Sequence, residues 1–142
     1  ELSINRIENK KYIDSIVTLA SIIEKEAKID SERPIIASVF YNRLKAKMPL
    51  QSCATVQYIL PHRKENLSIE DTKIDSPYNT YIYLGLPPSP ICNPGKASIL
   101  AAIKPAKTQY RFFAVDENGH HRFSKTFSEH QQFVKAKINN KL

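Results

Sequence analysis

The sequence predicts an α+β fold: a mainly helical single domain, residues 1–142, with a central buried helix and a small antiparallel β-hairpin. Three observations lead to this prediction. The chain has 142 residues, 42% of them hydrophobic and 25% charged, which suits one globular domain with a core of its own. One segment, Ile13–Ala27, is apolar around most of a helix. Another, Tyr110–Lys125, has two strand-like runs flanking an Asn-Gly turn.

The central helix is expected to run from about Lys11 to Lys28, after a polar start (residues 1–11) that carries no clear signal. At ~100° per residue its apolar side chains form a wide stripe, which is typical of a buried helix. Glu24 falls inside this stripe and Glu26 lies beside Leu19. The stripe consists of Ile13, Ile16, Val17, Ala20, Ile23 and Ala27, widened by Leu19 and Ile22.

A second helix is predicted from about Glu32 to Ala46, with Asp30-Ser31 as its N-cap and Pro34 in its first turn. The short connection between these two helices predicts an αα-hairpin or corner. A short helix, Thr55–Leu60, should end at Pro61. The following residues, 62–75, form a charged, exposed excursion in which Ser68-x-x-Asp71 can open a helical turn.

The proline-rich stretch Ser76–Pro94 also carries tyrosine, isoleucine and leucine, which favours an ordered surface loop over a flexible linker. A helix is expected over Lys96–Ile103, before Pro105. The hairpin turns at Glu117-Asn118-Gly119, and a last helix should run from Glu129 to about Ile138.

Composition excludes several classes of function. No apolar run is long enough to cross a bilayer, the three glycines form no phosphate loop, and no Gly-x-Ser-x-Gly elbow occurs. Cys53 and Cys92 stand alone, so we expect no zinc site, no other metal and no cofactor. The net charge of +7 is spread along the chain, which suits either an anionic partner or a solvated basic surface. We expect no nucleic acid as a partner, because no aromatic residues are interleaved with the lysines.

The two glutamates of the central helix are the sharpest chemical signal. An apolar setting raises the pKa of a carboxyl group, so that it stays protonated near neutral pH and can act as a general acid. Cleavage of a glycosidic bond needs such an acid. The alternative is structural: Glu24 and Glu26 would form ion pairs with Arg33, Arg43 or a lysine.

Several segments together resemble the catalytic domain of the endolytic murein transglycosylases, the YceG-like (MltG) family. The similarity extends over nearly the whole chain, in order and at the family's spacing. The segments are LASIIEKEA (19–27), ERPIIASVFYNRL (32–44), LQSCATVQY (50–58), SPYNTYIYLGLPPSPICNPG (76–95), AAIKPAK (101–107) and GHHRFSKTFSEH (119–130).

This resemblance implies that the buried helix is a catalytic helix in a lysozyme-like active-site arrangement. The family cleaves peptidoglycan glycan strands internally, between N-acetylmuramic acid and N-acetylglucosamine, and leaves a 1,6-anhydro sugar. It places the catalytic acid at Glu26, the second glutamate of the Glu-Lys-Glu triplet. Cell-wall synthases are implied as partners and the location as extracytoplasmic, on the periplasmic face of the inner membrane. The family's membrane anchor and LysM-like part lie outside this sequence.

The resemblance also implies a set of residues around the substrate. Glu24 is expected to support the site, paired with Arg43, and Asn42 to face the cleft. Two further segments are expected to line it, as cleft wall and as sugar-binding surface. With Glu24 and Asn42, the expected substrate-binding residues are Gln51, Ser52, Thr55, Tyr78, Asn79, Thr80 and Tyr81.

One departure from the family pattern concerns the third segment. Relatives often carry Asp-Pro where this chain has Cys53-Ala54. We interpret the aspartate as tuning the reaction without being essential to it. A non-catalytic glycan-binding module of the same family is the alternative function, and a basic nucleic-acid-binding domain is a third.

Overall fold

The computed structural model describes the backbone of residues 2–139 and the side chains of residues 9–138. It contains five α-helices and one two-stranded antiparallel sheet within the described residues, so the predicted α+β class is confirmed. The elements are α1 (Leu2–Glu26), α2 (Arg33–Lys45), α3 (Cys53–Ile59), α4 (Lys96–Ile103), β1 (Phe112–Val115), β2 (His121–Ser124) and α5 (Phe127–Asn139).

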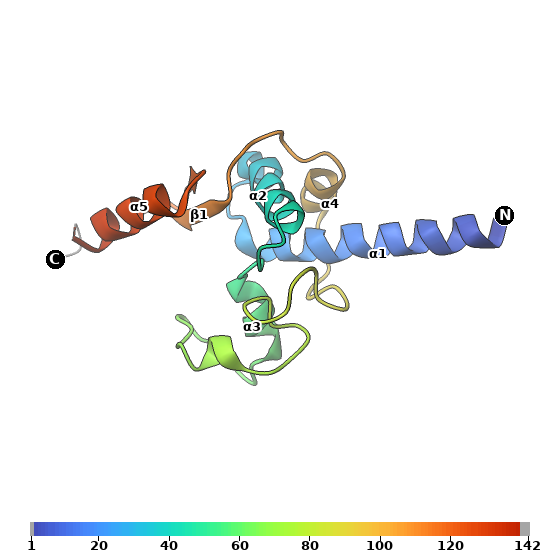
Figure 1. Cartoon of the computed structure of the whole chain (residues 1–142), viewed down its shortest axis with the longest axis horizontal. Coiled ribbons are helices and arrows are strands. Elements are labelled where there is room, and N and C mark those ends of the chain that lie inside the picture. The colour runs from blue at the N-terminus through green and yellow to red at the C-terminus, as the bar shows by residue number, and fades with distance from the viewer. Residues whose placement is uncertain (1, 140–142) are drawn as a thin grey trace.

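Helix α1 is the central element, but only its C-terminal half is buried. Leu19, Ile22 and Ile23 are almost fully buried, whereas Ile13, which we placed in the apolar stripe, is 57% exposed. In Figure 1 the N-terminal half of α1 projects beyond the rest of the molecule. The helix also begins at Leu2, well before the predicted start. The described side chains of this half, residues 9–15, are all exposed, so the helix extends beyond the part of the sequence that an apolar stripe marks.

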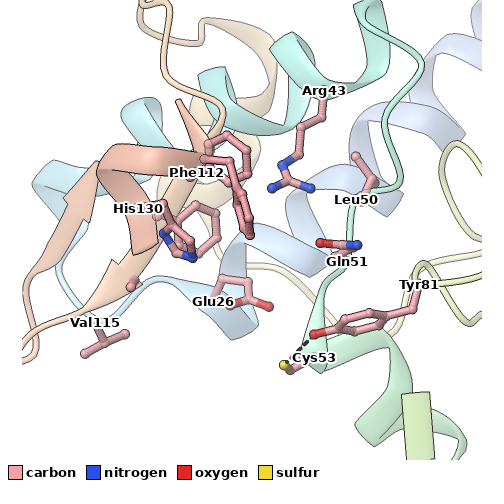
Figure 2. A pocket seen from close by; sticks show the side chains of 12 residues that line it. Glu26, Arg43, Leu50, Gln51, Cys53, Tyr81, Phe112, Val115 and His130 are labelled. Carbon is pink, nitrogen blue, oxygen red and sulfur yellow. Dashed lines mark hydrogen bonds between the residues drawn. The ribbon is translucent and has the colours of Figure 1, made fainter. Parts of the chain in front are cut away.

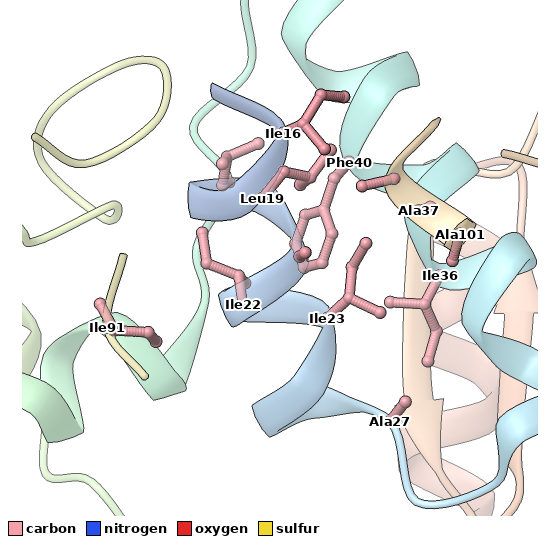
Figure 3. Packing of buried hydrophobic residues seen from close by; sticks show 13 residues of the cluster. Ile16, Leu19, Ile22, Ile23, Ala27, Ile36, Ala37, Phe40, Ile91 and Ala101 are labelled. Carbon is pink, nitrogen blue, oxygen red and sulfur yellow. The ribbon is translucent and has the colours of Figure 1, made fainter. Parts of the chain in front are cut away.

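The core forms where α2 and α4 pack against the C-terminal half of α1 (Figure 3). Phe40 on α2 is 1% exposed and meets the ring of Phe113 edge-on, with 5.7 Å between the ring centroids. The short connection between α1 and α2 contains a 3-10 turn, Asp30–Glu32, and the two helices pack against each other, as predicted. The buried cluster fixes the end of α1, and therefore Glu26, in the middle of the domain.

Between α3 and α4 the chain has little regular structure, yet polar side chains order it. The predicted turn at Ser68 is confirmed: Ser68 N–H donates to Asp71 Oδ2 (2.9 Å), and Asp71 N–H donates to Ser68 Oγ (3.1 Å). Buried Asn79 donates from Nδ2 to the carbonyls of Thr72 (3.0 Å) and Ile74 (2.8 Å). The proline-rich stretch is therefore an ordered loop, as predicted.

The hairpin β1–β2 pairs Phe113 with Phe123 and turns through Gly119, whose φ is +83°. It attaches to the helical body through Glu32, at the start of α2. Both carboxylate oxygens of Glu32 accept the backbone N–H of His121, at 3.1 and 3.0 Å, and Oε1 lies 3.1 Å from His121 Nδ1. This buried contact holds the hairpin beside the end of α1.

We predict that Glu32→Ala lowers the free energy of unfolding by about 2–4 kcal/mol, because it leaves the buried His121 N–H and ring without a partner. Denaturant titration followed by circular dichroism measures this change. The control is Glu70→Ala on the exposed excursion, which should cost less than about 0.5 kcal/mol. Equal stability of the two variants would contradict the role of Glu32 as an anchor.

Candidate active site

Glu26 is the last residue of α1 and lies against the beginning of α3. Its carboxylate Oε1 accepts a hydrogen bond from the hydroxyl of Ser52, the residue that precedes α3, at 2.7 Å. The backbone N–H of Ala54 also donates to this carboxylate. Glu26 is half-buried, so it can combine an apolar surrounding with access to a pocket.

A chain of buried hydroxyl groups holds Ser52 in place. Thr80 Oγ1 accepts the backbone N–H of Ser52 (2.9 Å) and lies 2.9 Å from Thr55 Oγ1. The Gln51 N–H donates to the Thr80 carbonyl (3.2 Å), and Gln51 itself has a φ of +50°. A residue other than glycine is uncommon in this left-handed region and is held there by its surroundings. The loop at Thr80 therefore sets the position of the donors to Glu26.

The electrostatic setting of Glu26 is that of a general acid. Burial raises the pKa of its carboxyl group above the ordinary glutamate value. The hydrogen bonds from Ser52 and Ala54 and the nearby His121 oppose this rise, but burial outweighs them. A carboxyl group with a raised pKa keeps its proton to higher pH, as an acid that protonates a leaving group must.

Two pockets meet at Glu26. The first has a volume of about 330 Å³, and Figure 2 shows the Glu26 carboxylate on its floor, with aromatic side chains on one side and Gln51, Cys53 and Tyr81 on the other. Its aromatic side includes Phe112 and His130, whose rings stack with centroids 5.3 Å apart. The lining residues are Glu26, Arg43, Leu50, Gln51, Cys53, Tyr81, Phe112, Phe113, Ala114, Val115, Phe127 and His130.

The second pocket, about 540 Å³, shares Glu26, Cys53 and Val115 with the first. The two pockets therefore adjoin at Glu26, and we refer to them together as the groove. The second pocket is lined by Lys25, Glu26, Lys28, Cys53, Ala54, Gln57, Tyr58, Arg63, Lys64, Glu65, Ile91 and Val115.

The structure brings four of the residues expected at the site together: Glu26, Gln51, Ser52 and Tyr81. Gln51 and Tyr81 line the first pocket, whereas Ser52 is buried and donates a hydrogen bond to Glu26. The Tyr81 hydroxyl lies 3.1 Å from Cys53 Sγ, and burial raises the pKa of Tyr81. The four residues come from three segments of the chain: Glu26 from α1, Gln51 and Ser52 from the residues before α3, and Tyr81 from the loop after α3.

Five other expected residues lie away from the groove, which corrects their expected places. Asn42 donates from Nδ2 to the carbonyls of Thr108 (3.0 Å) and Tyr110 (2.8 Å), so its amide fastens the chain before β1 and does not face Glu26. Thr55, Asn79 and Thr80 are at most 1% exposed and cannot touch a substrate. Tyr78 packs on Tyr58 and binds Ser89 through its hydroxyl (2.6 Å).

Glu24 is also separate from the groove, and the expected pairing with Arg43 was wrong, whereas the structural alternative of an ion pair with Arg33 is confirmed. It lies 3.5 Å from Arg33, not beside Arg43, and its Oε1 accepts the N–H of Gly95 at 2.6 Å. A Cβ at position 95 would lie 3.0 Å from that oxygen, so glycine permits the contact. Arg33 also donates to Ser98 Oγ (2.8 Å). Glu24 therefore joins α1 to α2 and α4.

Arg43, Cys53, Phe112 and His130 are among the groove residues that were not predicted as site residues. Arg43 donates to the carbonyls of Arg111 (2.6 Å) and Pro49 (2.8 Å) and lies 5.0 Å from the Phe112 ring centroid. Burial lowers the pKa of His130. Phe112 and His130 arrive from the C-terminal hairpin and helix, and no local pattern links them to Glu26. For Cys53, the sequence feature that could have marked it as a site residue was the replacement of the family's Asp-Pro by Cys53-Ala54.

The described residues contain no group of three or more His, Cys, Asp or Glu side chains placed to hold a metal ion. Cys53 and Cys92 are free thiols. None of the helices within the described range is both long and apolar enough to span a membrane.

Comparison with known proteins gives consistent matches. The sequence model of the YceG-like family matches residues 3–136. An endolytic murein transglycosylase of Bacillus subtilis (strain 168) is 46% identical over 134 residues, covering 94% of this chain and 37% of the relative. One of Streptococcus pneumoniae (strain D39 / NCTC 7466) is 35% identical over 136 residues, covering 92% of this chain and 25% of the relative.

A crystal structure of a YceG-like protein from Listeria monocytogenes superposes with a TM-score of 0.84 and 44% sequence identity. The match covers 89% of this chain and 42% of that one. The chain thus spans between a quarter and about two fifths of the length of these proteins.

The raised pKa of Glu26 predicts how stability depends on pH. Because the folded pKa exceeds the unfolded one, the folded state binds more protons between the two values, and stability falls as pH rises through that range. Glu26→Gln removes the titration but keeps an oxygen that can accept from Ser52. We therefore expect the free energy of unfolding of this variant, minus that of the unmodified chain, to be larger at about pH 7 than at about pH 4. Urea unfolding of both proteins at the two pH values measures this difference. A difference that is the same at both pH values would contradict the raised pKa.

Proposed function

This chain belongs to the YceG-like family, and on that premise we propose that it is the catalytic domain of an endolytic murein transglycosylase. It would cleave peptidoglycan glycan strands internally, at the bond between N-acetylmuramic acid and N-acetylglucosamine. Because murein lies outside the cytoplasmic membrane, we propose that the chain acts there, as part of a longer, membrane-anchored protein that works beside cell-wall synthases. The observation that carries the proposal is Glu26, a half-buried carboxyl group of raised pKa on the floor of an open groove.

In the proposed reaction, Glu26 acts first as acid and then as base. Its proton passes to the glycosidic oxygen as the bond to C1 of the muramic acid breaks, which releases the N-acetylglucosamine side as an alcohol. The Glu26 carboxylate then takes the proton of the C6 hydroxyl as that oxygen attacks C1. The products are a 1,6-anhydro end and a regenerated acid, and no water is consumed. One residue alternating between these roles follows the logic of general acid–base catalysis.

The lining of the first pocket supports a reaction with a single carboxylate. Among the described residues that line this pocket, Glu26 is the only acid. The second pocket adds only Glu65, which lies exposed on the excursion. A hydrolase that uses a carboxylate nucleophile needs a second carboxyl group about 5 Å away, across the sugar ring. The intramolecular hydroxyl of the muramic acid removes that need.

The walls of the groove suit a glycan. Tyr81 and Phe112 are aromatic side chains on opposite sides of Glu26, and aromatic side chains pack against sugars. Gln51 offers an amide for the acetamido and hydroxyl groups of the sugars. The two pockets that adjoin at Glu26 leave space beside it for more than one sugar, as cleavage inside a strand requires.

The test is digestion of purified, uncross-linked glycan strands, with anhydromuramyl-ended fragments measured by mass spectrometry. We expect Glu26→Gln to lower their production at least about 100-fold, since it removes the proton donor. The control is Glu70→Gln, an exposed carboxylate outside both pockets, which should retain full activity. A folded, unmodified chain that binds the strands without cutting them would instead favour a glycan-binding module, the function that the Cys53 departure allows.

A second prediction concerns the hydroxyl that donates to Glu26. Ser52→Ala removes a hydrogen bond that lowers the pKa of Glu26, so this pKa should rise further. Because the acid must be protonated, the basic limb of the pH–rate profile should move to higher pH. The control is Ser89→Ala, whose hydroxyl binds Tyr78 and lines neither pocket. A basic limb that stays in place would argue against Glu26 as the group that titrates.

A further inference from the structure

The two halves of the groove differ in charge. In the first pocket the only cation is Arg43, and three contacts already occupy it: two carbonyls and the ring of Phe112. The rest of that pocket is aromatic, aliphatic, an uncharged amide or the Cys53 thiol, apart from Glu26. Four cations line the second pocket: Lys25, Lys28, Arg63 and Lys64.

Most of the cations of the second pocket are free to bind a ligand. Lys64 is engaged with Asp71, whose two oxygens it meets at 2.9 Å, and these hydrogen bonds hold the pKa of Asp71 at about 2. The ion pairs found among the described residues do not include Lys25, Lys28 or Arg63. All three side chains are exposed at the rim.

The rim is assembled from separate segments around an uncharged floor. Lys25 belongs to the last turn of α1, Lys28 follows that helix, and Arg63 comes from the exposed excursion after α3. The same pocket is lined by the uncharged residues Ala54, Tyr58, Ile91 and Val115. Cations from two separate segments thus line one pocket together with an apolar surface, and the acids in that lining are Glu26 and Glu65.

Resting on the proposed function, we propose that this second pocket binds the stem peptide carried by a muramic acid of the strand, through the peptide's carboxylates. The sugars of the strand carry no charge of their own, so a carboxylate on a muramic acid substituent is the chemistry that this rim fits. Two sources exist: the stem peptide, or the lactyl group once the peptide has been removed. Long, mobile side chains at the rim, away from the groove floor, favour the peptide, which extends from the sugar ring.

The test compares two substrates and two triple variants. Lys25→Gln/Lys28→Gln/Arg63→Gln removes the free rim cations. Lys96→Gln/Lys104→Gln/Lys107→Gln removes the same charge from exposed lysines on and after α4 that line neither pocket. Each is assayed on peptide-bearing strands and on strands stripped by an amidase, which leaves free lactyl carboxylates.

We expect the rim variant to lose about tenfold in kcat/KM on peptide-bearing strands, as about three exposed ion pairs would give. It should lose less than about twofold on stripped strands, and the loss should shrink at high salt. The α4 variant should match the unmodified chain on both substrates.

If the unmodified chain is active, three results would overturn the inference. An equal loss on stripped strands would assign the rim to the lactyl carboxylate. An equal loss in the α4 variant would reduce the effect to net charge, and unchanged kcat/KM of the rim variant would remove the site. If the unmodified chain cuts neither substrate, the proposed function fails. Binding of the Glu26→Gln chain to the two kinds of strand then tests the rim by itself, and equal affinity for both would overturn it.

Discussion

The contact between the end of α1 and the beginning of α3 is the one on which the candidate site depends. Glu26 closes the buried helix, and the Ser52 hydroxyl and the Ala54 N–H meet its carboxylate there. Burial by the helical core raises the pKa of the acid, while these donors fix its direction. The core thus supplies the low dielectric that raises the pKa of Glu26, and the start of α3 supplies the donors that orient its carboxylate. A carboxyl group that is both protonated and oriented needs the two together.

Polar residues buried outside the helices carry much of the remaining organisation. The chain from α3 to α4 has almost no regular structure, so Asn79 and Thr80 satisfy backbone groups that a sheet or helix would otherwise pair. Glu32 does the same for the hairpin at His121. Asn79 orders this loop from within, whereas Thr80 and Glu32 join the loop and the hairpin to the helical body near Glu26. Buried hydrogen bonds of this kind specify one arrangement, because any other leaves polar groups unpaired.

The fold was largely predictable because its signals are local. Helical periodicity, Pro34 and the Asn118-Gly119 turn correctly indicated the buried helix, the packed pair of α1 and α2, and the β-hairpin. The N-terminal extension of α1 was missed for a physical reason. Periodicity reports burial against a neighbour, and residues 9–15 of this half are exposed, so Ile13 was wrongly placed in a core that begins at Ile16.

By itself, the sequence determined the α+β class, the buried helix and, through its resemblance to a family, Glu26 as the candidate acid. Tertiary structure decided which neighbours reach that acid. It placed Gln51, Ser52 and Tyr81 at the groove, and it turned Asn42 and Glu24 toward structural partners. The groove wall at Phe112 and His130 comes from residues about 90 to 100 positions away from Glu26. Periodicity fixes only the face on which a side chain lies, whereas the segment that meets this face depends on packing between distant parts of the chain.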